Sequence, residues 1–272
     1  TAERVSSLLS EQLGSTMRLT VLGGSAASPN AGMGCAGLLV QTDRTRLVLD
    51  LGPGTLQELR RHTDFRALDA VIVSHMHVDH VLDLLALRHA LAYNPLPAPA
   101  PVPIWLPPGG AEFLTQATAP FDACDEPGRF AATVKVAEYD PARSLTIGDV
   151  VVTFAPAMHY IPAWAIRVQP PAGPALGYTG DTGPAAALAE FFAGVHTLVA
   201  EATLLEPAVR SSDERGSLTA AEAGQLAVTA GSEILVLTHM WDELGFAVYR
   251  AQAEAVFPGQ IEMAAPGLTL SW

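Results

Sequence analysis

The segment SHMHVDH, residues 74–80, brings three histidines and one aspartate close together. His75 and His77 are two residues apart, so their side chains point to the same side of an extended segment. Asp79 and His80 come where the chain turns into a helix and can point elsewhere. Imidazole and carboxylate groups suit zinc and similar divalent ions. The segment therefore predicts a metal site, and its four residues could supply two ligands to each of two neighbouring ions.

Three more candidate residues come at the ends of strand-like segments. His159 ends VVVTFAPAMH, Asp181 lies in GYTGDTG, and His239 ends EILVLTHM. Taken singly, each is an ordinary polar or turn residue. Because each follows a strand-like run, as the first cluster does, we expect all of them to converge on one edge of the sheets. No role is expected for the remaining histidines, which are His62, His89 and His196.

The elements that position these residues alternate between strands and helices. Apolar β-branched runs and polar turns predict strands in 17–24, 37–52 (two strands), 68–75, 149–159, 163–169, 175–183, 195–202 and 233–240. Helical spacing of apolar residues predicts helices in 55–62, 81–92, 184–194, 217–231 and 245–257. Residues 35–54 and 163–183 share one layout: strand, polar turn, strand, then aspartate and glycine. The pattern predicts an α/β chain of two similar halves, packed sheet on sheet with helices outside.

The chain organisation predicts one domain over residues 17–272. The Pro-rich segment 94–110 is interpreted as a rigid loop crossing this domain, although VPIWL within it is strand-like. Residues 1–16 are interpreted as a peripheral helix or as an extension foreign to the protein. They show no secretory pattern. Cys35 and Cys124 are expected to be ordinary thiols, which fits a cytoplasmic location.

Composition and charge restrict the partners. The 272 residues carry a net charge of −13 and are 49% hydrophobic, which is typical of a globular protein. Lys135 is the only lysine. Nucleic acid and anionic membranes both attract basic surfaces, so neither is expected as a partner. No apolar run is long enough for a transmembrane helix.

Taken in order, SHMHVDH, the His in AMHYIP, the Asp in GYTGDTG and the His in LTHM resemble the metallo-β-lactamase superfamily. The resemblance covers the chain from Met17 to Trp272. It implies an αββα sandwich, in which two mixed β-sheets pack face to face with helices on both outer sides and the metal site at one edge. It also implies two ligand sets with Asp181 bridging them: His75, His77 and His159 for one ion, and Asp79, His80 and His239 for the other.

The same resemblance implies a hydrolase that uses two divalent metal ions. Zinc is the first candidate, with Mn²⁺ and Fe²⁺ as alternatives. Two such ions share a hydroxide that serves as the nucleophile. Asp79 and Asp181 would hold and orient it, and Glu201 in LVAEATL would support the site from behind the metal ligands.

Within the superfamily the chain is similar to the ribonuclease Z and cyclic-nucleotide phosphodiesterase branch. The segments that carry this similarity are VLGGSAASP, LVLDLGPGT, GYTGDTG, LVAEATL and LTHM. They imply hydrolysis of a small phosphodiester resembling a cyclic nucleotide. The chain lacks the basic, Gly-rich arm with which ribonuclease Z holds tRNA, so tRNA is not expected as a substrate. Members of the family often form homodimers, but no segment indicates an interface.

One departure from the family pattern keeps a second reaction open. Ser217 occupies a position where relatives carry a histidine that acts with the glutamate near the leaving group. Serine is no proton donor near neutral pH. Lactones, esters and thioesters, whose leaving groups need less acid assistance, are therefore the alternative substrates. Oxygen or sulfur chemistry on iron, and a binding protein without catalysis, are further alternatives. Tyr160, Trp164 and Trp241 either line a pocket at the site or pack in the core.

Overall fold

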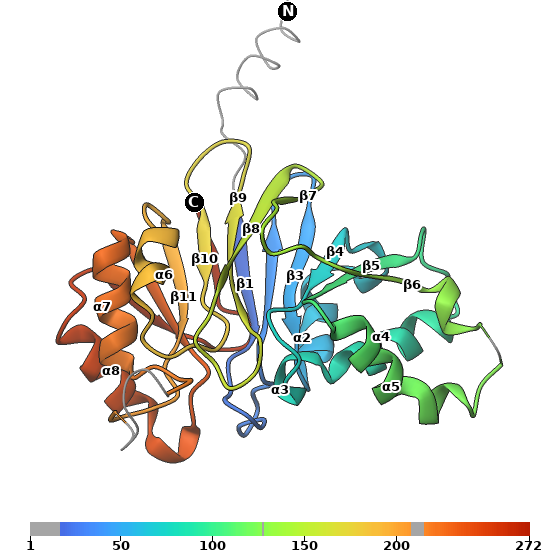
Figure 1. Cartoon of the computed structure of the whole chain (residues 1–272), viewed down its shortest axis with the longest axis horizontal. Helices are drawn as coiled ribbons and strands as arrows, with labels where there is room; N and C mark the ends of the chain where they lie inside the picture. Colours follow the sequence, from blue (N-terminus) through green and yellow to red (C-terminus); the bar gives the residue numbers. More distant parts are fainter. Residues whose placement is uncertain (1–16, 127, 208–214) are drawn as a thin grey trace, which may run out of the picture.

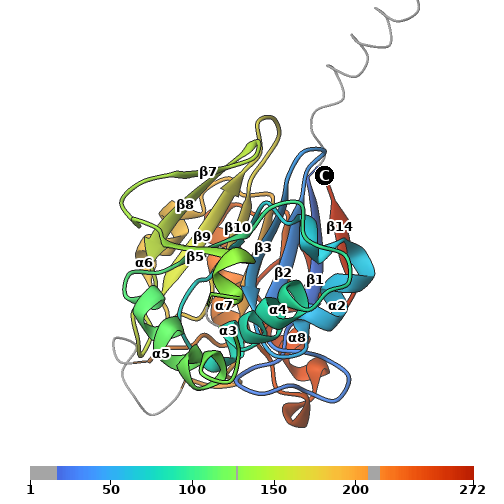
Figure 2. The same cartoon turned by 90° about the vertical axis from the view of Figure 1, so that its right-hand side faces the viewer.

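The computed structural model describes residues 17–126, 128–207 and 215–272. Two seven-stranded sheets pack face to face, with α2, α3, α4 and α5 on one outer side and α6, α7 and α8 on the other (Figure 1). Figure 2 shows the first group of helices lying in front of the sheets. The αββα sandwich predicted from the sequence is confirmed.

Each sheet contains both antiparallel and parallel pairs. The first sheet has the order β14-β1-β2-β3-β4-β5-β6. Its strands are β1 (Arg18–Gly23), β2 (Gly37–Gln41), β3 (Arg46–Leu51), β4 (Ala70–Ile72), β5 (Val102–Leu106), β6 (Val134–Glu138) and β14 (Thr269–Ser271). The second has the order β13-β12-β11-β10-β9-β8-β7. Its strands are β7 (Leu145–Ile147), β8 (Val150–Pro156), β9 (Trp164–Gln169), β10 (Leu176–Tyr178), β11 (Thr197–Glu201), β12 (Ile234–Thr238) and β13 (Gln260–Met263).

The helices cover the outer faces of the sheets. They are α2 (Thr55–His62), α3 (Val78–Val81), α4 (Asp83–Ala92), α5 (Gly110–Asp122), α6 (Ala186–Phe191), α7 (Ala220–Ala230) and α8 (Phe246–Glu254). Short 3-10 turns are η1 (Phe65–Ala67), η2 (Phe130–Ala132) and η4 (Asp242–Leu244). None of the helices in the described residues has the length and apolar character needed to cross a bilayer.

Local sequence explains the best-defined elements. β4 and β11 are buried at every residue, because one face packs on the opposite sheet and the other on helices. α7 begins with a capping box in which Thr219 and Glu222 satisfy each other's backbone N–H groups, and ends at Gly231, whose φ of 72° suits glycine. β4, which precedes His75 and His77, is thus fixed by burial on both faces.

The prediction that residues 94–110 form a loop was wrong for residues 102–106. Val102–Leu106 forms β5, an interior strand that pairs in parallel with both β4 and β6. Val102, Ile104 and Leu106 are buried on one side, which is the alternation expected of a strand. The surrounding prolines concealed this pattern. α5, β6, β7, β13 and β14 were also not predicted, and residues 1–16 lie outside the described residues.

Candidate metal centre

The predicted ligands come from the carboxyl ends of strands in both sheets. His75 and His77 follow β4, His159 follows β8, Asp181 follows β10 and His239 follows β12. α3, which carries Asp79 and His80, lies at the lower end of the two sheets in Figure 1. Strand ends of this kind hold side chains rigidly while leaving them accessible. The seven predicted residues are therefore brought together at one edge of the sandwich.

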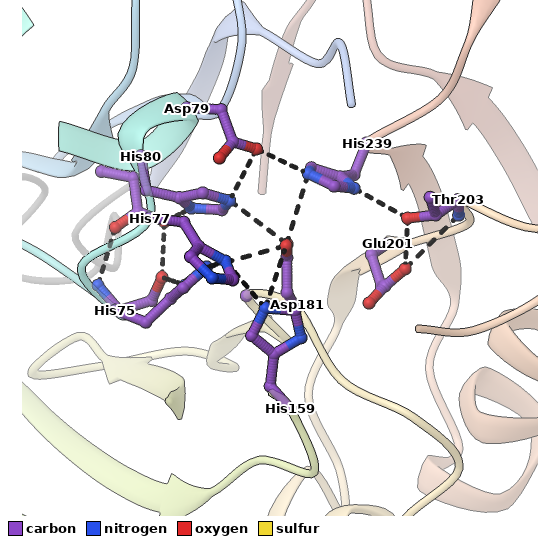
Figure 3. Close-up of polar contacts among 12 residues, drawn as sticks. His75, His77, Asp79, His80, His159, Asp181, Glu201, Thr203 and His239 are labelled. Carbon is purple, nitrogen blue, oxygen red and sulfur yellow. Dashed lines mark hydrogen bonds and ion pairs between the residues drawn. The ribbon is translucent and has the colours of Figure 1, made fainter. Parts of the chain in front are cut away.

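The first group consists of His75, His77, His159 and Asp181, whose ligand atoms lie within 4.8 Å of one another. The Nε2 atoms of His75 and His159 lie 3.1 and 3.0 Å from Nδ1 of His77. An Asp181 carboxylate oxygen lies 3.7 Å from Nε2 of His75. Figure 3 shows the three rings turned toward this common point. Three imidazole nitrogens and one carboxylate form a donor set suited to a divalent ion.

The second group consists of Asp79, His80, Asp181 and His239, and all four are buried. Nε2 of His239 lies 3.0 Å from Oδ2 of Asp79, and Nε2 of His80 lies 3.3 Å from Oδ1 of Asp181. Asp181 thus belongs to both groups and lies between them (Figure 3). An anion in this position would reduce the repulsion between two neighbouring cations.

Asp50 holds the second group from behind. It is fully buried at the end of β3, and its Oδ2 lies 2.7 Å from Nδ1 of His80. The same carboxylate accepts hydrogen bonds from the backbone N–H and hydroxyl of Ser74 and from the hydroxyl of Tyr178, each at 2.7 Å. A carboxylate on the far nitrogen of a histidine fixes the ring and leaves Nε2 free to bind a metal ion. Sequence reasoning missed Asp50.

The other rings are held in the same way. Nδ1 of His159 donates to the carbonyl oxygen of Gly216 at 2.7 Å. Nδ1 of His75 lies 3.0 Å from the Ser74 hydroxyl, and Nδ1 of His239 lies 2.7 Å from the Thr203 hydroxyl. With His80, four of the five histidines therefore have their outer nitrogen occupied, so that the inner nitrogen faces the centre. This orientation is typical of metal-binding histidines.

Two buried polar atoms show that the cluster fits a metal ion. Within the described part of the chain, Nε2 of His80 and Oδ1 of Asp181 have no hydrogen-bond partner. They face each other at 3.3 Å without the geometry of a hydrogen bond. Buried polar groups normally find partners, because leaving one unsatisfied costs about 1–3 kcal/mol. A divalent ion bound to both atoms would remove this cost.

The electrostatics of the two groups differ. Burial, reinforced by the neighbouring His80, lowers the pKa of His75 well below its usual range and keeps the ring neutral. Burial also lowers the pKa of His80, but Asp181 and Asp50 outweigh it and hold that pKa well above its usual range. Only a neutral imidazole binds metal, so an ion at His80 must displace a proton.

Glu201 is connected to the site by hydrogen bonds through the side chain of Thr203. Its Oε1 accepts from the backbone N–H of Thr182 at 2.6 Å, and its Oε2 accepts from the Thr203 hydroxyl at 2.5 Å. That hydroxyl also lies beside Nδ1 of His239, as Figure 3 shows. Glu201 therefore stands behind His239, where its contacts favour a positioning role.

The Glu201→Gln variant tests whether the carboxyl group of Glu201 is protonated in the metal-free protein. Burial, followed by the charge of Asp181, raises the pKa of Glu201 from 4.5 to about 8. Between these pH values the folded protein holds a proton that the unfolded chain releases, so the free energy of unfolding falls as pH rises. In urea unfolding with a chelator, the free energy of unfolding of the variant should rise by roughly 2–5 kcal/mol relative to that of wild type as pH increases across this window. Parallel pH curves for the two proteins would contradict this assignment.

Ser217 and Tyr160 lie beside the first group. Ser217 is buried and directly follows Gly216, the residue whose carbonyl oxygen holds His159. Tyr160 packs against the same glycine and is exposed to solvent, whereas Trp164 packs against the core between the sheets. The aromatic residues were expected either to line a pocket at the site or to pack in the core. Tyr160 fits the first alternative and Trp164 the second. Cys35 and Cys124 are free thiols, as predicted.

Known proteins are similar to this chain in sequence and in fold. The chain is 29% identical over 246 residues to an uncharacterized protein of Mycobacterium tuberculosis, covering 88% of this chain and 87% of the other. It is 27% identical to the probable metallo-hydrolase YhfI of Bacillus subtilis, covering 92% of this chain and 98% of the relative. The crystal structure of YhfI superposes with a TM-score of 0.82, covering 95% of this chain and 100% of that one.

A ribonuclease Z of Bradyrhizobium diazoefficiens is 27% identical, covering 88% of this chain and 95% of the relative. This similarity supports the branch predicted from the sequence. The model of the beta-lactamase superfamily domain matches residues 45–240, which include the seven residues brought together at the sheet edge. The chain is therefore a member of the beta-lactamase superfamily, in its ribonuclease Z-like and metallo-hydrolase branch.

Proposed function

We propose that the protein is a dinuclear metal-dependent phosphodiesterase that acts on a small phosphodiester resembling a cyclic nucleotide. The observation that carries the proposal is the sharing of Asp181 between two four-residue groups of metal-binding type. When bound, two divalent ions lower the pKa of a water molecule and stabilise the charge that develops on the phosphoryl oxygens. A metallo-hydrolase is what the family membership supports.

The residues of the chain have distinct roles in this reaction. The five histidines supply neutral nitrogen donors, four of them oriented by partners on their outer nitrogens. Asp79 and Asp181, the two acidic members, direct carboxylate oxygens toward the space between the groups, where they orient the attacking water. Glu201 keeps His239 in place through Thr203.

Zinc is the proposed metal, because imidazole with carboxylate is a donor set that zinc accepts readily. Mn²⁺ and Fe²⁺ suit the same donors and are the alternatives.

A small substrate is proposed rather than tRNA. The ribonuclease Z relative is by its name a ribonuclease, and ribonucleases cleave phosphodiester bonds. This chain carries a net charge of −13, however, and nucleic-acid affinity depends on neutralising many phosphates. A small diester needs only the metal centre for its single phosphate. A cytoplasmic location fits such a substrate and stays a prediction, as does the homodimer.

Hydrolysis of a lactone, ester or thioester is the second candidate. The buried Ser217 next to Gly216 favours it, because no imidazole stands there to protonate an alkoxide. To separate the two candidates, the zinc- and manganese-loaded protein is offered a phosphodiester, a lactone and a thioester. Preference for the diester would support the proposal. Faster cleavage of the thioester or lactone would replace it by the second candidate.

Ser217→His should improve cleavage of diesters with poor leaving groups. A positioned general acid typically contributes about 10²–10⁴-fold, so we expect at least a tenfold rise in kcat for an alkyl diester. Cleavage of bis(p-nitrophenyl) phosphate, whose leaving group is a weak base, should change little. Ser217→Ala is the matched control and should resemble wild type with both substrates. Equal changes with both substrates would show that residue 217 has no part in protonating the leaving group.

A further inference from the structure

One large aromatic side chain at the metal centre is open to solvent. Tyr160 directly follows the predicted ligand His159, and 59% of it is exposed. Val78, between His77 and Asp79, is 57% exposed. Exposed apolar side chains are ordinary when scattered, but these two flank predicted metal ligands on separate segments. They give the rim of the site an apolar character.

The Tyr160 ring is held in place by the site itself. Its centroid lies 5.1 Å from the centroid of the His159 ring. A Cβ atom placed on Gly216 would lie 2.8–3.0 Å from three of the Tyr160 ring carbons, so the ring rests directly on a glycine backbone. The carbonyl oxygen of that glycine holds His159 at 2.7 Å. One part of the ring is thus anchored beside the ligands while the rest is open, and an anchored ring loses little entropy when a ligand binds.

Among the described residues, the charged side chain that adjoins Gly216 offers no competing way to bind the organic part of a substrate. Arg215, which precedes Gly216, is buried and paired with Glu222. The chain as a whole is strongly acidic. The phosphate of a diester would be bound at the metal centre, so the remainder of the molecule meets the apolar rim. A planar, weakly charged group would gain most from contact with the Tyr160 ring.

We propose that Tyr160 is a specificity-determining residue that stacks on a nucleobase, so that the substrate is a nucleoside cyclic phosphodiester. This inference rests on the proposed phosphodiesterase function and adds the group that the enzyme recognises besides the phosphate. Base–aromatic stacking tolerates different bases, because every base has a flat face. The site should therefore distinguish base-bearing from base-free diesters more strongly than one base from another.

The test compares two cyclic diesters in which the same phosphorus–oxygen bond is broken. One is adenosine 3′,5′-cyclic phosphate, and the other is methyl riboside 3′,5′-cyclic phosphate, with a methoxy group in place of the base. We expect the ratio of kcat/KM for the first to that for the second to fall about tenfold in Tyr160→Leu. The ratio should stay within about twofold of wild type in Tyr160→Phe, which keeps the ring. Phe113→Leu, at an exposed aromatic of α5, is the matched surface control and should keep the wild-type ratio.

The outcomes separate the inference from the function on which it rests. If the wild type cleaves neither compound, the phosphodiesterase proposal fails and the inference fails with it. If it cleaves both but Tyr160→Leu leaves the ratio unchanged, the inference alone is overturned. An equal loss in Tyr160→Phe and Tyr160→Leu would also overturn it, because the hydroxyl rather than the ring would then be responsible.

Discussion

Asp181→Ala is expected to abolish metal-dependent hydrolysis, with kcat/KM falling by about three orders of magnitude or more. Asp181 is the one residue common to both groups. Burial works against its charge, but His239 and His80 hold the pKa of Asp181 well below its usual range, so it is an anion. Without it, each group keeps three donors, but the anion between the two cations is lost. Metal content should therefore fall together with activity.

Activity assays with metal analysis by mass spectrometry check this prediction. Thermal unfolding of the metal-free variant should show that the fold survives, because the sheets are held by a separate apolar core. Asp181→Asn is the matched control, since it keeps the shape of the side chain and removes its charge. Wild-type turnover in either variant would show that Asp181 is not part of the active site.

Asp50→Ala is expected to have the largest effect on stability. The substitution removes the acceptor of two buried hydroxyls, of a backbone N–H and of the outer nitrogen of His80. Removing one member of a buried charged network typically costs about 3–5 kcal/mol. Asp50 also has a φ of 56°, a left-handed conformation that aspartate tolerates better than alanine. Both effects lower the free energy of unfolding.

Metal affinity should fall as well, by about 10–100-fold, because loss of an outer partner of a metal-binding histidine typically has this effect. Urea unfolding with a chelator measures the stability, and a competitive metal titration measures the affinity. Asp50→Asn, which keeps one acceptor oxygen, should lie between wild type and Asp50→Ala in both. If Asp50→Ala bound metal as tightly as wild type, His80 would not depend on this carboxylate.

The candidate ligands could be predicted from sequence because their signal is local. H-x-H-x-D-H follows a short buried strand, and His159, Asp181 and His239 follow strand-like runs of their own. Parallel strands end at one edge of a sheet, so residues that follow them are brought together. Burial on both faces of the strands before His75, Asp181 and His239 made them recognisable as apolar runs.

The supporting residues were missed because their contacts depend on tertiary packing. Thr203 touches both Glu201 and His239, and the spacing between these residues does not predict it. Asp50, in contrast, has a signal in the sequence. It ends the strand–turn–strand–Asp–Gly layout of the first half, as Asp181 ends the same layout in the second, and β2–β3 and β9–β10 are antiparallel pairs in both. The repeated aspartate is a proposed metal ligand in the second half, Asp181, and in the first half, Asp50, a residue that holds the proposed ligand His80.

The most direct test of the central claim is turnover of bis(p-nitrophenyl) phosphate as zinc or manganese is titrated into metal-free protein. The proposed site predicts that turnover rises with added metal and reaches a plateau at two equivalents per chain. The negative control, Asp181→Ala, should show no turnover at any metal concentration. A protein that binds two equivalents without turnover would contradict the phosphodiesterase assignment. A plateau at one equivalent would contradict the dinuclear centre.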